Sequence, residues 1–131
     1  MFGKNFKWYR ITHRLYCRQK LEAPYDSLFR YYFNIAMGKP VYGNGHYDFF
    51  SMLRFDNITN RALCDLRTIL PQHLLDNLLG AYEAFNTFDD DTEVDVIIDT
   101  MAKYDDYSDD HAEEIADILR GYVSEIKGKK I

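Results

Sequence analysis

The chain has 131 residues, a length that suits one domain able to bury a core without disulfides or metal ions. Hydrophobic residues make up 47% of it and aromatic residues 16%, a composition that excludes intrinsic disorder. The net charge of −5 argues against direct nucleic-acid binding, and no window holds the roughly 18 apolar residues of a membrane span.

The N-terminal segment, residues 1–22, is basic, with six basic residues and no acidic one in its first 20 positions. The stretch YRITHRLYCR fits a strand, in which alternate residues face inward, and equally a helix, in which Tyr9, His13 and Cys17 share a face. In both cases one side carries a basic stripe that could hold phosphates or pair with the protein's own acidic helices. The basic stripe consists of Arg10, Arg14 and Arg18.

The same segment has no continuous apolar run, so we expect neither a secretory signal nor a membrane anchor. The two cysteines, Cys17 and Cys64, show no metal-binding or redox spacing and are expected to be reduced and partly buried. These features predict a cytoplasmic protein.

Residues 24–86 have the pattern of a helical core. Pro24 lies near the start of the first helix and Gly38 just past its end, which is the usual placement of these residues. Apolar residues then recur at helical spacing, interrupted by a glycine-rich loop at 40–47. The predicted helices cover 25–37, 48–55, 57–70 and 74–85.

The third segment, residues 89–127, is strongly acidic, with 13 acidic residues and the single Lys103 between Asp89 and Asp117. We predict two helices in it. The first begins near Thr92, the chain breaks at YDDYS, residues 104–108, and the last helix is capped by Ser108 or Asp109. The apolar side of the last helix is predicted to contain Ala112, Ile115, Ala116, Leu119, Tyr122, Val123 and Ile126.

The acidic residues do not have the spacing of a calcium loop. Counted from Asp89, the sixth residue is Val94 where glycine is required, and the twelfth is Thr100 where glutamate is required. Acidic residues are favourable in the first turns of helices, so a merely solubilising surface would account for many of them. However, several acidic residues are spaced by four, where like charges destabilise a helix by about 0.2–0.5 kcal/mol per pair.

This retained repulsion favours a surface that faces a positively charged partner. The acidic residues expected to make that contact are Asp95, Asp99, Asp106, Asp110, Glu113, Glu114 and Asp117. In general character the chain resembles the DNA-mimicking inhibitors of phages and mobile elements, which are small, acidic, rich in aromatic residues and without an active site. The resemblance implies a nucleic-acid-binding host protein or ribonucleoprotein complex as partner, such as a CRISPR effector. If a phage encodes the protein, the expected location is the host cytosol.

No catalytic motif appears. The four histidines, His13, His46, His73 and His111, form no metal-binding motif, because Leu70 and Ser108 stand where a carboxylate-bridged di-metal site needs acidic residues. Each histidine is therefore expected on the surface or hydrogen-bonded in the core. The sequence GNGH at 43–46 is too short for a phosphate-binding loop. We expect no enzyme activity, no cofactor and no bound metal.

The sequence thus predicts a mainly α single domain over 1–131, a bundle of five to six helices. A short N-terminal strand or hairpin, giving an α+β fold, is the alternative. The leading functional hypothesis is an anti-defence inhibitor, of anti-CRISPR type, that binds its target through the acidic surface. The alternatives are a nucleic-acid-binding or regulatory module that uses the basic stripe, and a helical assembly subunit whose acidic and basic poles join in an oligomer.

Overall fold

The computed structural model describes residues 7–37 and 45–130, and within these ranges the fold is entirely helical. The predicted mainly α single domain is confirmed, with seven α-helices in the described ranges where five to six were expected. Within the N-terminal segment the described stretch Lys7–Cys17 is a helix, so the strand alternative is wrong for these residues, while residues 1–6 lie outside the described ranges. The elements are α1 (Lys7–Cys17), α2 (Tyr25–Tyr32), the π-helical segment η2 (Phe33–Met37), α3 (His46–Phe55), α4 (Thr59–Ile69), α5 (Gln72–Phe85), α6 (Val94–Asp110) and α7 (Ala112–Lys130).

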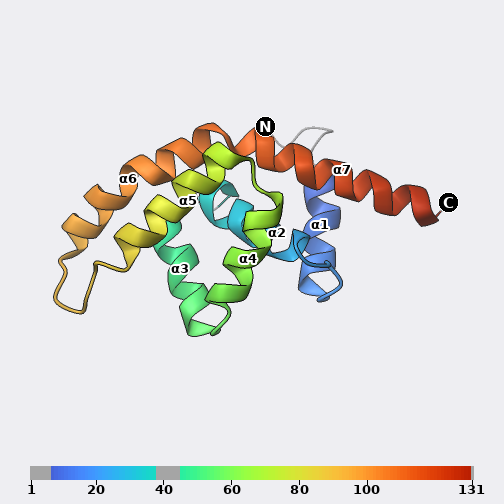
Figure 1. Cartoon of the computed structure of the whole chain (residues 1–131). Coiled ribbons are helices and arrows are strands. Elements are labelled where there is room, and N and C mark those ends of the chain that lie inside the picture. Colours follow the sequence, from blue (N-terminus) through green and yellow to red (C-terminus); the bar gives the residue numbers. More distant parts are fainter. Residues whose placement is uncertain (1–6, 38–44, 131) are drawn as a thin grey trace.

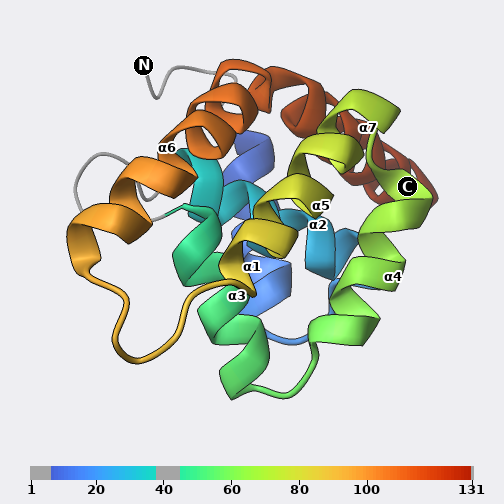
Figure 2. The same cartoon turned by 60° about the vertical axis from the view of Figure 1, so that its left-hand side comes forward.

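Helices α6 and α7 follow one another as an arched ridge along one side of the molecule (Figure 1). Helix α6 packs on α3, α5 and η2, whereas α7 packs on α1 and α2. The view in Figure 2 shows the same ridge above α3 and α4, which meet at the opposite edge. None of the described helices is long and apolar enough to cross a membrane.

All seven helices contribute to one core, because each has apolar residues at the spacing that keeps them on one face. The predicted apolar side of the last helix is confirmed: Ile115, Ala116, Leu119 and Val123 are buried. The predicted apolar faces of α4 and α5 also point inward. The largest side chains at the centre are fully buried and include Phe29, Tyr31, Phe49, Phe50, Leu66, Leu78 and Met101.

The helix predicted over 25–37 is continuous, but its last part widens into η2. Asn34 Nδ2 donates to the carbonyl of Arg30 at 2.9 Å, four residues earlier. A side-chain donor at that carbonyl competes with the backbone N–H that would continue the α-helical pattern. The widened segment carries the buried Ile35 against α3 and α6.

The predicted break at YDDYS is wrong. Helix α6 continues through this stretch to Asp110, the chain bends at His111, and neither Ser108 nor Asp109 caps α7. The reason is that Tyr104, Tyr107 and Ser108 follow helical spacing and face the body of the protein, so the stretch is amphipathic. It contains no glycine or proline that would end a helix.

Candidate functional site

The outer side of α6 carries a row of exposed carboxylates. At about 100° per residue these side chains fall in an arc of roughly 100°, opposite the side that contains the buried Met101 and Ser108. With a rise of about 1.5 Å per residue, the row extends over about 22 Å of helix. We call it the α6 acidic face: Asp95, Asp99, Asp106, Asp109 and Asp110.

The described residues place little positive charge against this face. Among the described residues, no basic side chain forms an ion pair with Asp95, Asp99, Asp109 or Asp110. The lysine of the same helix, Lys103, places its ammonium group 5.0 Å from the centre of the Tyr104 ring. The carboxylates of Asp95, Asp99, Asp109 and Asp110 therefore repel one another without a counter-charge among the described residues.

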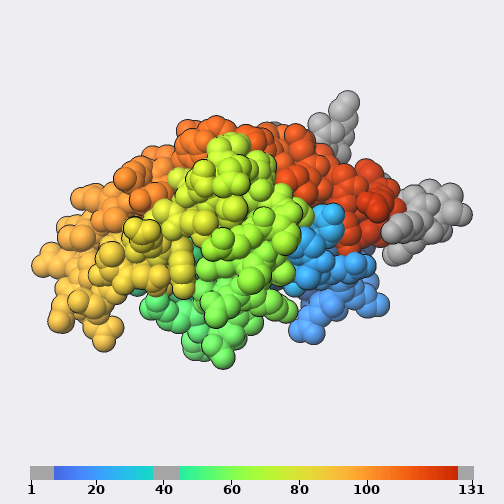
Figure 3. Space-filling view, viewed as in Figure 1, coloured from blue at the N-terminus to red at the C-terminus, as the bar shows by residue number. Residues whose placement is uncertain are grey.

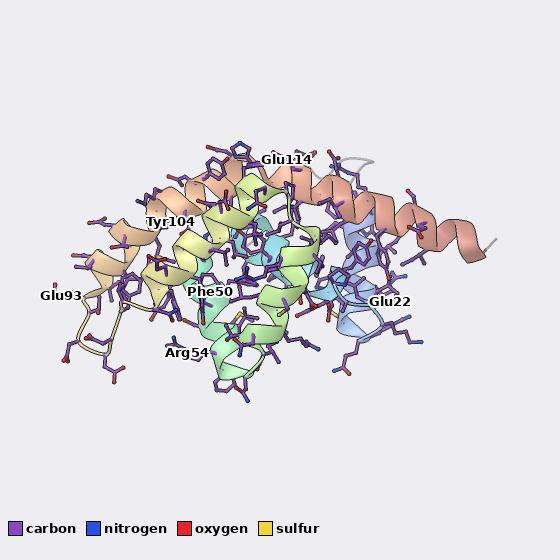
Figure 4. The ribbon with its side chains drawn as sticks, viewed as in Figure 1. Glu22, Phe50, Arg54, Glu93, Tyr104 and Glu114 are labelled. Carbon is purple, nitrogen blue, oxygen red and sulfur yellow. The ribbon has the colours of Figure 1, made fainter. Side chains whose placement is uncertain are left out.

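Exposed aliphatic side chains flank the acidic face in the first turns of α6. Val94 is 68% exposed, Val96 51% and Ile98 59%, and only Ile97 and Thr100 in this part of the helix are partly buried. The start of α6 therefore extends beyond the core, at the end of the molecule opposite the end of α7 (Figure 3). Glu93, just before α6, is labelled at this end in Figure 4. Carboxylates next to exposed aliphatic groups are a composition suited to a protein interface.

The carboxylates of α7 behave differently from those of α6. Arg120 donates to Glu113 at 2.9 Å and also to Asp117, and its guanidinium lies 5.3 Å from the centre of the Trp8 ring. The hydrogen bond to Glu113 raises the pKa of Arg120 above its ordinary value. Glu114 accepts from His73 Nε2 at 2.7 Å.

The predicted seven-residue surface is therefore divided. Four of its members, Asp95, Asp99, Asp106 and Asp110, share the α6 acidic face, and Asp110 belongs to α6 and not to the last helix as predicted. The other three lie on α7, where Glu113 and Asp117 pair with Arg120 of the same helix and Glu114 contacts His73 of α5. Glu113 and Asp117 are exposed and Glu114 is partly exposed, so all three lie on the outer side of α7, but each already has a partner within the protein.

The basic stripe lies along α1 and the residue that follows it. Arg10, Arg14 and Arg18 are exposed and line one shallow groove together with His13 and Cys17. Among the described residues no carboxylate pairs with any of the three arginines, so pairing with the protein's own acidic helices is not seen there. The sulfur of Cys17 lies 3.7 Å from His13 Nε2, and both Cys17 and Cys64 are exposed, not partly buried as predicted.

A buried polar network fastens α6 to α2, α3 and α5. Asn77 Nδ2 donates to Ser108 Oγ at 2.9 Å, Ser108 lies 2.8 Å from Tyr31 Oη, and Tyr31 lies 2.7 Å from His46 Nε2. The other ring nitrogen, His46 Nδ1, donates to Asp105 Oδ1 at 2.7 Å. If the imidazole of His46 is neutral, each hydroxyl and N–H group that links these five side chains has one acceptor. This confirms His46 as a hydrogen-bonded core histidine.

Ser108, His46 and Asp105 are the residue types of a hydrolase triad, but Tyr31 lies between Ser108 and His46 in this network, and the Ser108 hydroxyl is 3.5 Å from His46 Nε2. Ser108, His46 and Tyr31 are fully buried, and no described groove reaches the Ser108 hydroxyl. Burial also raises the pKa of Tyr31, which keeps its hydroxyl protonated. Asp105 accepts from the backbone N–H of His46 as well, at 2.9 Å, and so caps the start of α3 from a distant helix.

Sequence reasoning missed one further cluster. His73, His111 and Glu114 come together where α5 meets the α6–α7 bend, each with one potential ligand atom within 4.8 Å of the others. His111 and Glu114 are three positions apart, but His73 comes from 38 residues earlier, so only the tertiary structure brings it to the pair. No local spacing signal could have revealed this contact.

Comparison with known protein families, curated proteins and solved structures finds no match. The functional argument therefore depends on the arrangement of this chain's own residues.

Proposed function

We propose that the protein is a non-enzymatic inhibitor that binds a basic, nucleic-acid-binding protein through the α6 acidic face. The observation that carries the proposal is the row of exposed carboxylates opposite the buried side of α6, four of which, Asp95, Asp99, Asp109 and Asp110, form no ion pair with a described residue. A helix selected only for stability would gain from interleaved lysines, because like charges four positions apart repel. A partner of opposite charge would convert this repulsion into attraction.

The dimensions of the face suit a groove that normally holds a phosphate backbone. Its length of about 22 Å corresponds to about six base-pair steps of 3.4 Å along one strand. The exposed Val94, Val96 and Ile98 would add apolar contacts at one end, as protein interfaces usually contain both kinds of contact. We propose a nucleic-acid-binding protein or ribonucleoprotein complex as the partner class, with a CRISPR effector of the host as one candidate and an anti-defence role as the consequence.

The test compares two variants of equal net charge. The face variant is Asp95→Asn/Asp99→Asn/Asp106→Asn/Asp110→Asn, and all four positions are exposed. The control variant neutralises four exposed carboxylates outside α6: Glu22→Gln, Asp56→Asn, Asp76→Asn and Glu125→Gln.

Both variants and the wild type are used for affinity capture from host cytosol, followed by quantitative mass spectrometry. We expect a basic nucleic-acid-binding protein to be captured by the wild type and the control variant but not by the face variant. Equal capture by all three proteins would contradict the proposal.

A second candidate function rests on the basic stripe. Arg10, Arg14 and Arg18 form one exposed row, and no described carboxylate neutralises them. Three guanidinium groups in a row suit a nucleic-acid backbone or the acidic surface of a second copy. Fluorescence anisotropy with single-stranded DNA and RNA tests for nucleic-acid binding, and sedimentation of the free protein tests for association with a second copy. The leading proposal predicts neither.

A further inference from the structure

We infer a binding site for Zn²⁺ formed by His73, His111 and Glu114, which goes beyond the proposed function and is independent of it. His73 lies in the first turn of α5, His111 is the residue between α6 and α7, and Glu114 lies in the first turn of α7. Figure 4 shows Glu114 at the junction of the two long helices. The ligand atoms lie within 4.8 Å of one another, and His73 Nε2 is 2.7 Å from Glu114 Oε1.

The neighbouring Tyr107 orients both imidazole rings. Its backbone carbonyl accepts from His111 Nδ1 at 2.8 Å, and its hydroxyl lies 2.8 Å from His73 Nδ1. Metal-binding histidines usually have such a partner on the second ring nitrogen, because it fixes the tautomer and the ring orientation. With both Nδ1 atoms engaged by one residue, the metal-binding atoms are the two Nε2 atoms, of which that of His73 must first give up its hydrogen bond to Glu114.

The ligand set selects the kind of metal. Two imidazole nitrogens and one carboxylate oxygen suit Zn²⁺, whereas Ca²⁺ and Mg²⁺ prefer oxygen ligands alone. Ligand atoms on one tetrahedral Zn²⁺ lie about 3.3 Å apart, so small side-chain rotations suffice to bring these three to the ion. The side chains of His73 and Glu114 are 39% and 43% exposed, which leaves room for such rotations and for water as fourth ligand.

Binding requires one change in the present hydrogen bonds. His73 Nε2 now donates to Glu114, so binding must separate these two groups and free Nε2 for the ion. The neutral imidazole has one proton, which therefore has to change from Nε2 to Nδ1 by exchange with solvent, and the hydroxyl oxygen of Tyr107 can then accept a hydrogen bond from Nδ1–H. The bound ion would hold the start of α5 against the bend between α6 and α7.

The test is calorimetric titration of Zn²⁺ into the full chain, purified without a histidine tag and stripped of metal. We expect saturable binding of one ion per chain, which His111→Gln and Glu114→Gln each weaken by more than tenfold. Tyr107→Phe keeps the carbonyl contact but removes the hydroxyl, and should weaken binding by about tenfold or more. If His73→Gln does not fold, the other variants still decide the question, because circular dichroism reports their folding.

Two matched controls distinguish this site from others on the chain. Cys17→Ser removes the thiol next to His13, and the fourfold α6 face variant removes acidic residues that could attract the ion. Both should bind Zn²⁺ as the wild type does. The inference is wrong if no saturable binding occurs, if His111→Gln and Glu114→Gln bind like the wild type, or if Cys17→Ser abolishes binding. Absorption of bound Co²⁺ in place of Zn²⁺ should likewise be lost in His111→Gln.

Discussion

Removal of the Asp105 carboxylate should be the most damaging single change outside the apolar core. The Asp105→Ala variant leaves two donors of His46, the backbone N–H and Nδ1–H, without their acceptor, and the His46 side chain is fully buried. Each buried unsatisfied donor costs about 1–3 kcal/mol, so the free energy of unfolding should fall by roughly 3–5 kcal/mol. For a domain of this size that corresponds to a decrease in melting temperature of roughly 10–20 °C.

The measurement is chemical and thermal unfolding followed by circular dichroism. Asp109→Ala, four positions further along the exposed side of α6, is the matched control and should change stability by no more than about 0.5 kcal/mol. Gly45→Ala should disturb the same hydrogen bonds between Asp105 and His46, because the added Cβ would lie 2.5 Å from Asp105 Oδ2 and displace the carboxylate. The reasoning is refuted if Asp105→Ala and Asp109→Ala unfold with equal free energies.

Three further outcomes concern pH and the basic stripe. Burial, followed by the charge of Asp105, raises the pKa of Asp48 in the folded protein. The ionised carboxylate therefore lowers the free energy of unfolding at pH values above the raised pKa, and this loss disappears below the ordinary pKa of 3.8. Asp48→Asn should therefore raise the melting temperature at neutral pH, by an amount that vanishes in acid; a pH-independent difference would contradict this. Burial raises the pKa of Tyr9 to about 12, with a smaller effect of Tyr32, so stability should fall as pH rises above the ordinary 10.0 and fall less steeply in Tyr9→Phe. A tyrosinate absorbance titration that places every tyrosine of the folded protein near 10 would disprove the shift. Arg10→Ala/Arg14→Ala should leave the unfolding free energy within about 0.5 kcal/mol of the wild type and nucleic-acid binding negligible; micromolar binding lost in that variant would favour the second candidate function.

The helical architecture was predictable because apolar residues repeat at the helical period in most of the chain. Leu66, Leu74 and Leu78 are fully buried as their spacing indicates. The N-terminal segment was ambiguous, since its apolar residues fit both periods. In the structure this segment packs as a helix against α2 and α7, which buries Tyr9 and Thr12 and leaves Cys17 exposed.

The bend between α6 and α7 was misplaced because the cluster YDDYS was interpreted as a polar break. Two facts that tertiary structure supplies were missing: Ser108 is fully buried, and Asp105 caps another helix. Polar residues that pair with each other inside the core have the same sequence pattern as polar residues in a loop.

The candidate site was predictable in part. The α6 acidic face follows from helical periodicity, and the pairing of Arg120 with Asp117 could have been read from their spacing of three. The engagement of Glu114 by His73 could not, since it depends on how α5 and α7 pack.

The most direct test of the account is the affinity of the captured basic partner for the wild type, the α6 face variant and the control variant at two salt concentrations. Neutralising the face removes long-range attraction and charge-assisted contacts, whereas the control changes net charge equally elsewhere. We expect the face variant alone to bind more weakly and with a flatter salt dependence. Equal affinities and equal salt slopes for all three proteins would contradict the claim that the α6 acidic face recognises the partner.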